Sequence, residues 1–309
     1  QDGQFTVEIS REPISFRIAT LPCRYGEKVV LRLLHQVEQS LEIAALGMQD
    51  AQLAAFSQAL QQPQGLILVT GPTGSGKTVT LYSALQTRNT PDVNLCSVED
   101  PVEIPIAGIN QTQIHPRAGL TFQGVLRALL RQDPDIIMVG EIRDGETAEI
   151  ALKAAQTGHL VLSTLHTNSP VETLTRLGQM GIPGYLLASA LRLVIAQRLV
   201  RRLCPHCRSP AEKIDDLPAH LWSGSLQNWQ ATGCDHCFSG YYGRLALFEL
   251  LAINSELQTA IAADAGSETL NALAQRQDLN SLLVEGLHAV DRGDTSLAEV
   301  YRVIGVEHG

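Results

Sequence analysis

The sequence predicts an α/β protein built on a parallel-rich sheet that helices cover on both faces. Between residues 66 and 165, short apolar runs alternate with stretches of helical spacing. A glycine-rich segment joins the first run to a helix-forming stretch, and carboxylates follow two later runs. Strand–helix alternation of this kind produces parallel strands, because each crossover helix returns the chain to the same end of the sheet.

The elements follow in chain order from local patterns. Two extended segments are expected over residues 14–34, joined at Tyr25-Gly26-Glu27, because apolar runs flank a glycine turn. A helix is expected over 50–60, and the apolar spacing of 122–131 predicts another. Strands are expected at 66–69, 93–98, 136–139 and 160–164.

The rest of the chain is expected to be mainly helical outside a cysteine-rich section. Residues 171–203 read as further helices, and 245–309 read as several short helices. This pattern divides the chain into four parts: a smaller α/β domain over 1–47, an α/β core over 48–203, a cysteine module over 204–244 and a helical region over 245–309.

Length and charge exclude several classes of protein. A chain of 309 residues can form two domains with sizeable cores. The net charge of −9 argues against a broad nucleic-acid-binding face and leaves room only for a local basic patch. No run of 18 apolar residues and no secretory signal are visible, so we expect a cytoplasmic protein. Because the chain begins with Gln1, we expect that it is a fragment.

The glycine-rich segment matches the phosphate-binding pattern G-x-x-x-x-G-K-[ST] at every fixed position. An apolar run precedes it, and the following helix would direct its positive dipole end at the phosphates. In this pattern the lysine reaches the β and γ phosphates and the last hydroxyl binds Mg²⁺. A simple strand–helix turn is the alternative, but the flanking strand and helix favour nucleotide binding. The residues are Gly71, Pro72, Thr73, Gly74, Ser75, Gly76, Lys77 and Thr78.

Two acidic segments follow predicted strands, where ligands bind in open α/β sheets. Glu141 comes just after the strand at 136–139, so it is the candidate for polarising the attacking water. The alternative is an acidic residue capping a loop. Glu99 and Glu103 flank Asp100-Pro101 after the strand at 93–98. They are either a solvated turn or part of a Mg²⁺ site, and the phosphate loop favours the site. His166, after the strand at 160–164, is a further candidate.

Two C-x-x-C pairs, separated by 26 residues, predict a Zn²⁺ site. Four thiolates close a tetrahedral shell, so the metal is expected to be structural rather than catalytic. Disulfides are disfavoured in a reducing cytoplasm. His206 and His236 lie inside the two pairs and are expected to be exposed, while Cys23 and Cys96 are expected to pack in strands. The expected ligands are Cys204, Cys207, Cys234 and Cys237.

Taken together, these motifs resemble the ATPases of type II secretion and type IV pilus assembly over nearly the whole chain. The resemblance rests on GPTGSGKT, VEDPVE, DPDIIMVGEIRD and GHLVLSTLHTN in this order, and AQRLVRRLCPHC is similar to the assembly branch. It implies a RecA-like domain in a homohexameric ring, with each RecA-like domain preceded by the smaller domain. The tetracysteine insert agrees with the assembly branch.

The resemblance also implies roles for arginines. Arg17 and Arg32 occupy the positions from which the smaller domain reaches the phosphates, where guanidinium groups stabilise transferring charge. Any one of these arginines could instead form a surface ion pair. Family arginines assigned to the nucleotide or the interface match four further residues, Arg127, Arg131, Arg143 and Arg244.

The function implied by the resemblance is a Mg²⁺–ATP-hydrolysing motor that assembles pilin or pseudopilin filaments. Its implied partners are an inner-membrane platform protein and a membrane recruiting protein, so the motor would lie at the cytoplasmic face of that membrane. No direct binding of nucleic acid is expected. Two alternatives stay open: the motor of a DNA-uptake or conjugation system, and a regulatory switch that hydrolyses ATP slowly.

Overall fold

The structure is a computed structural model that describes residues 1–9, 12–34, 41–277 and 280–305. It consists of two compact units, residues 1–40 and residues 41–309. The sequence predicts this boundary after residue 47. The structure places it earlier because Leu41, Ile43 and Leu46 pack against the core of the second unit.

The first unit is an antiparallel sheet of three strands, β1 (Asp2–Ile9), β2 (Glu12–Cys23) and β3 (Gly26–Leu34), in the order β1-β2-β3. The two segments expected over 14–34 are confirmed, whereas β1 was not predicted. Helices of the predicted α/β domain do not occur among residues 1–9 and 12–34. Cys23 is the last residue of β2, so it lies in a strand as predicted, but it is exposed rather than packed.

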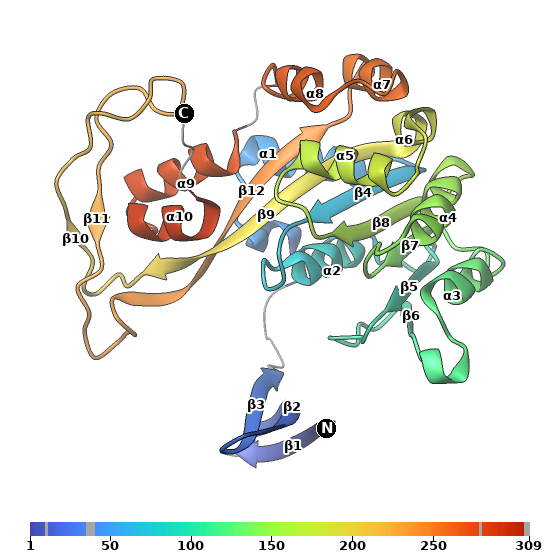
Figure 1. The fold of residues 1–309 in the computed structure, drawn as a ribbon, viewed down its shortest axis with the longest axis horizontal. Helices are drawn as coiled ribbons and strands as arrows, with labels where there is room; N and C mark the ends of the chain where they lie inside the picture. The colour runs from blue at the N-terminus through green and yellow to red at the C-terminus, as the bar shows by residue number, and fades with distance from the viewer. Residues whose placement is uncertain (10–11, 35–40, 278–279, 306–309) are drawn as a thin grey trace. The chain divides into compact units, whose positions relative to one another are not determined.

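The second unit holds a sheet of seven strands in the order β12-β9-β4-β8-β7-β5-β6, with helices on both faces (Figure 1). Six strands are parallel and β12 runs antiparallel to β9. This confirms the predicted parallel-rich α/β fold. The strands are β4 (Gly65–Thr70), β5 (Leu95–Glu99), β6 (Ile109–Gln113), β7 (Ile136–Val139), β8 (Leu160–Leu165), β9 (Leu191–Leu203) and β12 (Tyr241–Ala252).

One face of the sheet is covered by α1 (Asp50–Leu60) and α2 (Lys77–Arg88), whose Phe56 and Tyr82 are fully buried against it. The opposite face is covered by α3 (Phe122–Leu129), α4 (Gly145–Gln156), α5 (Pro170–Gln179), α6 (Gly184–Ala190), α7 (Ser255–Ala262) and α8 (Ser267–Ala274). Two short 3-10 helices, η1 (Ile43–Leu46) and η2 (Pro116–Ala118), complete this part. The helix expected over 50–60 and the strands expected between 66 and 164 are confirmed.

Side chains at the strand ends begin several of these helices. Asp144 accepts a hydrogen bond from Thr147 N at 2.8 Å and begins α4 directly after β7. Ser169 accepts from Glu172 N and is followed by Pro170, which begins α5 after β8. These caps satisfy N–H groups that have no partner within a helix. They therefore fix the short turns at the carboxyl edge of the sheet.

The predictions for residues 191–203 and for the start of the C-terminal region were wrong. Both were expected to be helical, but they form β9 and β12, which pair along their length. Strands buried on both faces are continuous apolar runs, and such runs cannot be told from buried helices by periodicity. Pairing with β4 on one side and β12 on the other makes β9 a strand.

The cysteine-rich section forms a lobe with the last two helices, α9 (Leu282–Asp291) and α10 (Leu297–Ile304). Two short strands, β10 (Ser209–Pro210) and β11 (Trp229–Gln230), pair within it. Leu226 of this section packs against Leu283 and Leu287 of α9 and Val300 of α10. The lobe therefore has a small core of its own beside the main sheet.

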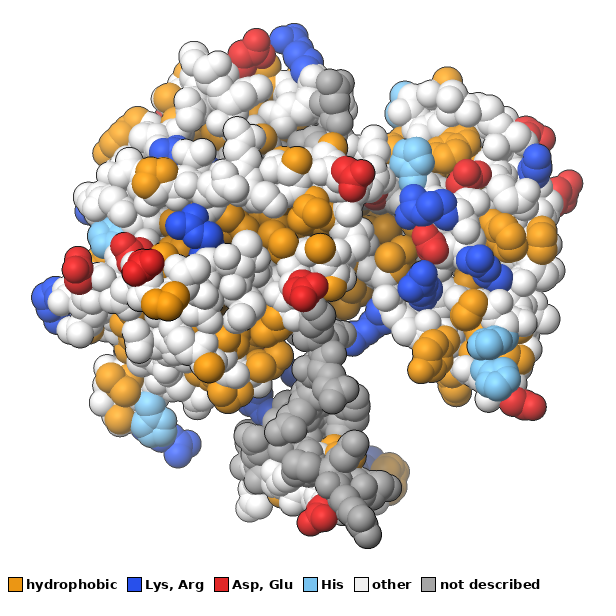
Figure 2. Space-filling model, turned by 180° about the vertical axis from the view of Figure 1, so that it is seen from behind, with side chains coloured by type: hydrophobic (Ala, Val, Ile, Leu, Met, Phe, Trp, Pro, Cys, Tyr) orange, Lys and Arg blue, Asp and Glu red, His pale blue; other side chains and the backbone are white. Residues whose placement is uncertain are grey.

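Basic side chains gather on this lobe (Figure 2), where four arginines are joined to two carboxylates. The most buried of these carboxylates is Glu299 on α10, whose side chain is fully buried. It accepts hydrogen bonds from Arg201 of β9 and Arg302 at 2.7 Å. Burial by itself acts to raise the pKa of Glu299, but these hydrogen bonds outweigh it and hold the pKa at about 2. The network thus ties α10 to the sheet.

The Glu299 network predicts acid-dependent stability. Because the folded-state pKa lies below the ordinary value of 4.5, its contribution is complete above about pH 4.5 and is lost as the pH falls towards 2. That contribution is roughly 3 kcal/mol. Glu299→Gln should therefore lower the free energy of unfolding at pH 7 by roughly 3–5 kcal/mol, since it leaves two guanidinium groups without a carboxylate. Urea unfolding at pH 7 and pH 3 measures this.

Other carboxylates also titrate in this range, so the comparison is between the wild type and Glu299→Gln at each pH. The difference in unfolding free energy should shrink as the pH falls. A difference that stays constant between pH 7 and pH 3 would show that Glu299 is not bound as its contacts indicate.

Candidate functional site

The phosphate-loop residues lie at the carboxyl edge of the sheet, between β4 and the first turn of α2. Gly74 and Gly76 have φ of 82° and 90°, a left-handed conformation that favours glycine. Lys77 is the first residue of α2, and its Nζ donates to Gly71 O at 2.8 Å and to Pro72 O at 3.0 Å. The loop therefore curls around its own lysine, and the N-terminus of α2 opens towards it.

Two side-chain groups of the loop are suited to phosphate and metal. Ser75 is buried, and its Oγ has no hydrogen-bond partner within the described part of the chain. A buried hydroxyl without a partner is costly unless a ligand supplies one. Thr78 follows Lys77 in the first turn of α2, half-buried, where the loop pattern places the Mg²⁺ ligand. The residues present thus fit a nucleotide phosphate with Mg²⁺.

Strand ends bring Glu141, Arg143 and His166 together beside the loop. Glu141 follows β7, and its carboxylate pairs with Arg143 and lies 3.5 Å from Nε2 of His166 after β8. Arg143 also approaches Oδ2 of Asp100, after β5, at 3.6 Å. Burial lowers the pKa of Lys77, and the charge of Glu141 acts in the opposite direction. Glu141 is therefore close enough to the phosphate-binding lysine to sense its charge.

Glu99 is placed differently from the other acidic candidates. It is buried at the end of β5, where its carboxylate accepts from Tyr82 Oη at 2.5 Å, Ser97 Oγ at 2.6 Å and Gln111 Nε2 at 3.1 Å. Burial and the Glu99 carboxylate raise the pKa of Tyr82, so the phenol stays a donor. Both oxygens of Glu99 are engaged inside the protein, towards α2 and β6.

Glu103 is exposed four residues further on. Its backbone N–H donates to Tyr82 Oη at 3.3 Å, so Tyr82 joins the turn of Glu103 to the Glu99 network. The acidic candidates therefore divide into two groups. Glu141 and Asp100 meet at the carboxyl edge, whereas Glu99 supports the turn from within.

Arg17 and Arg32 lie in the first unit, where they are cross-strand partners on β2 and β3 and are both exposed. Like charges directly opposite one another destabilise a sheet, so this pair is suited to an anion. In the second unit, Arg127 pairs with Glu146 at 2.7 Å, and Arg131 donates to Arg127 O. Arg244 of β12 lies opposite Arg201 of β9. Within the described part of the second unit, Arg143 contacts Glu141, whereas Arg127, Arg131 and Arg244 make their contacts elsewhere.

The four cysteines Cys204, Cys207, Cys234 and Cys237 form one cluster with all Sγ atoms within 4.8 Å of one another. Cys204 and Cys234 are 3.9 Å apart, and Cys237 is 3.7 Å from both Cys207 and Cys234. Zn–S bonds of about 2.3 Å in a tetrahedron give S–S distances of about 3.8 Å, whereas a disulfide needs about 2.05 Å. The donor set therefore fits zinc, and His206 and His236 are exposed, as predicted.

Two residues of the site were missed by sequence reasoning: Gln197 and Arg198, which lie under the phosphate loop in β9. A methyl group added at Gly71 would lie 2.5 Å from Gln197 O, and one at Gly76 would lie 2.8 Å from its Nε2. These contacts depend on β9 passing next to β4, which no local pattern revealed. The only available signal was a glutamine and an arginine within a long apolar run.

Fold and site together define a RecA-like protein with a phosphate-binding loop. A family model described as "Type II/IV secretion system protein" matches residues 1–302, and the chain belongs to this family. Among the described residues, the helices are too short or too polar to cross a membrane.

Several known proteins are similar to the chain. The "Protein transport protein HofB homolog" of Escherichia coli is 66% identical over 309 residues, which are 100% of this chain and 67% of that protein. The "Type IV pilus assembly ATPase PilB" of Pseudomonas aeruginosa is 49% identical, over 98% of this chain and 55% of that protein. The "Type II secretion system ATPase E" of Vibrio cholerae is 46% identical, over 98% of this chain and 61% of that protein. The chain thus spans only part of the length of these relatives.

Solved structures share the fold. The pilus retraction motor PilT with bound ADP matches 97% of this chain and 77% of its own, with a TM-score of 0.68 and 28% identity. The ATPase DotB of Legionella pneumophila matches 98% of this chain and 76% of its own, with a TM-score of 0.71 and 22% identity. The second match supports the fold alone.

Proposed function

We propose that this chain is the ATP-hydrolysing part of a motor that assembles pilin or pseudopilin filaments in type II secretion or type IV pilus biogenesis. The observation that carries the proposal is the position of Glu141. It lies at the carboxyl edge beside the phosphate loop, 3.5 Å from His166 and within electrostatic reach of Lys77. A carboxylate in this position can accept a proton from a water molecule that attacks the terminal phosphate.

The loop supplies the binding half of the reaction. Lys77 would exchange its bonds to Gly71 O and Pro72 O for phosphate oxygens, and loop N–H groups and Ser75 Oγ would donate to them. Thr78 would ligate Mg²⁺, which when bound neutralises charge on the phosphates. His166 would hold Glu141 or the γ phosphate by a hydrogen bond. Glu99 and Glu103 are assigned to the site as well, with Glu99 acting through Tyr82.

Arg17 and Arg32 are assigned to the phosphates from the first unit. Their cross-strand pairing places two exposed guanidinium groups on one face of a sheet, which favours an anion of high charge such as a triphosphate. Binding of ATP would neutralise this repulsion. ATP binding would therefore draw the two units together, and the units would separate again after hydrolysis.

The motor would work as a homohexamer at the cytoplasmic face of the inner membrane. Its partners would be the platform protein and the recruiting protein of the machine, with zinc stabilising the tetracysteine lobe. The names of two relatives support the kind of machine alone, because they are ATPases of type IV pilus assembly and of type II secretion.

Mg²⁺-dependent ATP turnover per chain, measured across protein concentration, tests the proposal. We expect turnover to rise with concentration, because sites shared between subunits are completed only in the ring. Light scattering at the same concentrations shows whether the ring forms. Turnover that stays flat while the chain remains a monomer would contradict shared sites. No turnover at any concentration would contradict ATP hydrolysis by this chain.

A further inference from the structure

Strand β9 passes under the phosphate loop, and its Arg198 contacts both this loop and the turn that follows His166. We propose that Arg198 is a positioning residue that holds these two segments in one arrangement for turnover. The inference rests on the proposed ATP hydrolysis and assigns a role that the phosphate-loop motif does not include.

The first set of contacts is with the loop. A methyl group added at Gly71 would lie 3.2 Å from Arg198 Nη1, so the guanidinium packs directly against the first residue of the loop. The same Nη1 donates to Gln197 O at 3.0 Å, and Gln197 O is itself the atom nearest to that methyl position. Arg198 therefore limits how far the start of the loop can move.

Gln197 supports the other end of the loop from the opposite face of the sheet. Its Oε1 accepts from Thr80 of α2 at 2.7 Å, and its Nε2 lies beside Gly76. Successive side chains of a strand point to opposite faces, which explains why neighbours in sequence reach the loop from two sides. The loop is thus held at both ends by one dipeptide of β9.

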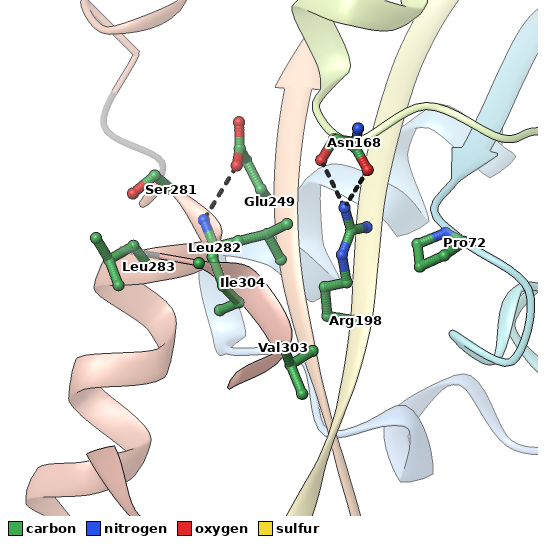
Figure 3. A pocket seen from close by; sticks show the side chains of 10 residues that line it. Pro72, Asn168, Arg198, Glu249, Ser281, Leu282, Leu283, Val303 and Ile304 are labelled. Atoms are coloured by element: carbon green, nitrogen blue, oxygen red, sulfur yellow. Dashed lines mark hydrogen bonds between the residues drawn. The ribbon is translucent and has the colours of Figure 1, made fainter. Parts of the chain in front are cut away.

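The second set of contacts is with the turn between β8 and α5. Arg198 Nη2 donates to Asn168 Oδ1 at 3.0 Å and to Asn168 O at 3.2 Å, and Figure 3 shows the guanidinium between Asn168 and Pro72. Asn168 is two residues after His166, which approaches Glu141. One side chain therefore links the phosphate loop to the segment that carries a candidate catalytic group.

Burial makes this link rigid. Arg198 is only 7% exposed, at one side of a cavity of about 310 Å³ that is also bordered by Pro72, Glu249 and Leu282. Burial lowers the pKa of Arg198, and the charges of Glu172 and Glu249 oppose this shift only in part. Glu249 also accepts a hydrogen bond from Leu282 N at 3.0 Å. A buried guanidinium with fixed acceptors has few alternative conformations.

The hydrogen-bond acceptors around Arg198 allow two possible roles of this residue to be told apart: holding two segments together, and supplying a positive charge. The guanidinium is a planar fork that can reach Gln197 O and Asn168 at once, whereas a lysine ammonium is a point charge on a flexible stem. Arg198→Lys would keep a positive charge near Lys77 and lose the bridge. Bridging therefore predicts a defective Arg198→Lys variant, and charge alone predicts a functional one.

The experiment compares Arg198→Lys and Arg198→Gln with the wild type by hydrogen exchange and by steady-state kinetics. In the exchange measurement, which needs no turnover, we expect amides of residues 71–76 and 166–169 to exchange about tenfold faster in both variants. In kinetics we expect kcat to fall about tenfold, while the Kd for ADP, which lacks the γ phosphate, changes by less than about threefold.

The matched control is Arg192→Lys. Arg192 lies on the same strand and donates to Ser189 O at 2.8 Å and to Leu191 O, at the end of β9 remote from the loop. The Arg192→Lys substitution should leave kcat unchanged, and the amides of residues 71–76 and 166–169 should exchange as fast as in the wild type. Two results would overturn the proposal: unchanged exchange at both segments in Arg198→Gln, or an Arg198→Lys variant that matches the wild type. An inactive wild type would count against the proposed function, and exchange would still decide the role of Arg198.

Discussion

Replacing Glu141 with glutamine is expected to leave nucleotide binding intact and to lower ATP turnover by about 10²-fold or more. Glutamine keeps the size of the side chain and can still accept a hydrogen bond from Arg143, which pairs with Glu141 in the structure. It cannot accept a proton from water. The change therefore removes the chemical capacity of position 141 and preserves most of its contacts.

Binding and turnover separate this effect from damage to the loop. Removing a negative charge near Lys77 favours phosphate binding, so the Kd for ATP should stay equal or fall. Lys77→Ala should do the reverse, because it deletes a charge-assisted contact worth about 1.5–3 kcal/mol, which raises the Kd roughly 10–100-fold. Isothermal titration with ATP and a phosphate-release assay measure both quantities.

Glu149→Gln is the matched control for Glu141→Gln. Glu149 lies on the exposed side of α4 and pairs with Lys153 at 2.6 Å. The Glu149→Gln substitution therefore makes the same chemical change outside the site. Its turnover should equal that of the wild type. Normal turnover in Glu141→Gln would show that this carboxylate does not activate the water, and Asp100, near Arg143, would become the next candidate.

The sequence predicts this candidate site for a physical reason. Phosphate binding by a loop needs glycine conformations and a lysine at fixed spacing, so Gly71 to Thr78 were recognisable as one local motif. Glu141 and His166 were predicted because each directly follows an apolar strand, and parallel strands end at one edge. Each of these residues could be predicted because its position depends only on the strand that directly precedes it in the sequence.

The residues that were missed depend on which strands are neighbours. Arg198 reaches the loop only because β9 lies beside β4, although more than 100 residues separate the two strands. The same limit explains the wrong helix prediction for residues 191–203, whose apolar run fits either structure until its partners are known. Glu99 shows the complementary limit. Its place at a strand end suggested the site, and only the side chains of Tyr82, Ser97 and Gln111 reveal that it points inward.

Joint replacement of Cys204 and Cys234 by serine is expected to remove one bound zinc ion per chain and to unfold the tetracysteine lobe. Each substitution removes a thiolate from the same cluster, so two of the four ligands are lost. The lobe has few sources of stability other than zinc, because its core is small and β10 and β11 span only two residues each. Small domains of this kind depend on their metal for folding.

The effect should be largest where the cysteine-rich section contacts α9 and α10. Trp229 Nε1 donates to Asp291 O at 3.3 Å, Arg208 donates to Gly293 O, and Leu226 is buried against both helices. Loss of zinc should therefore lower the melting temperature by about 5 °C or more. The main sheet has separate cores on its two faces that include none of the cysteine ligands, so its secondary structure should persist.

Mass spectrometry for metal content and thermal unfolding with and without a chelator measure these outcomes, with Cys23→Ser as the control. Cys23 is an exposed thiol in the first unit, so its replacement should change neither zinc content nor melting temperature. Wild-type protein without zinc would contradict the assignment of the four cysteines. The zinc-free variant should still bind ATP, because the loop is held by Gln197 and Arg198 of β9 rather than by the lobe. Zinc loss and loss of Glu141 would then differ in kind, the first acting on stability and the second on turnover.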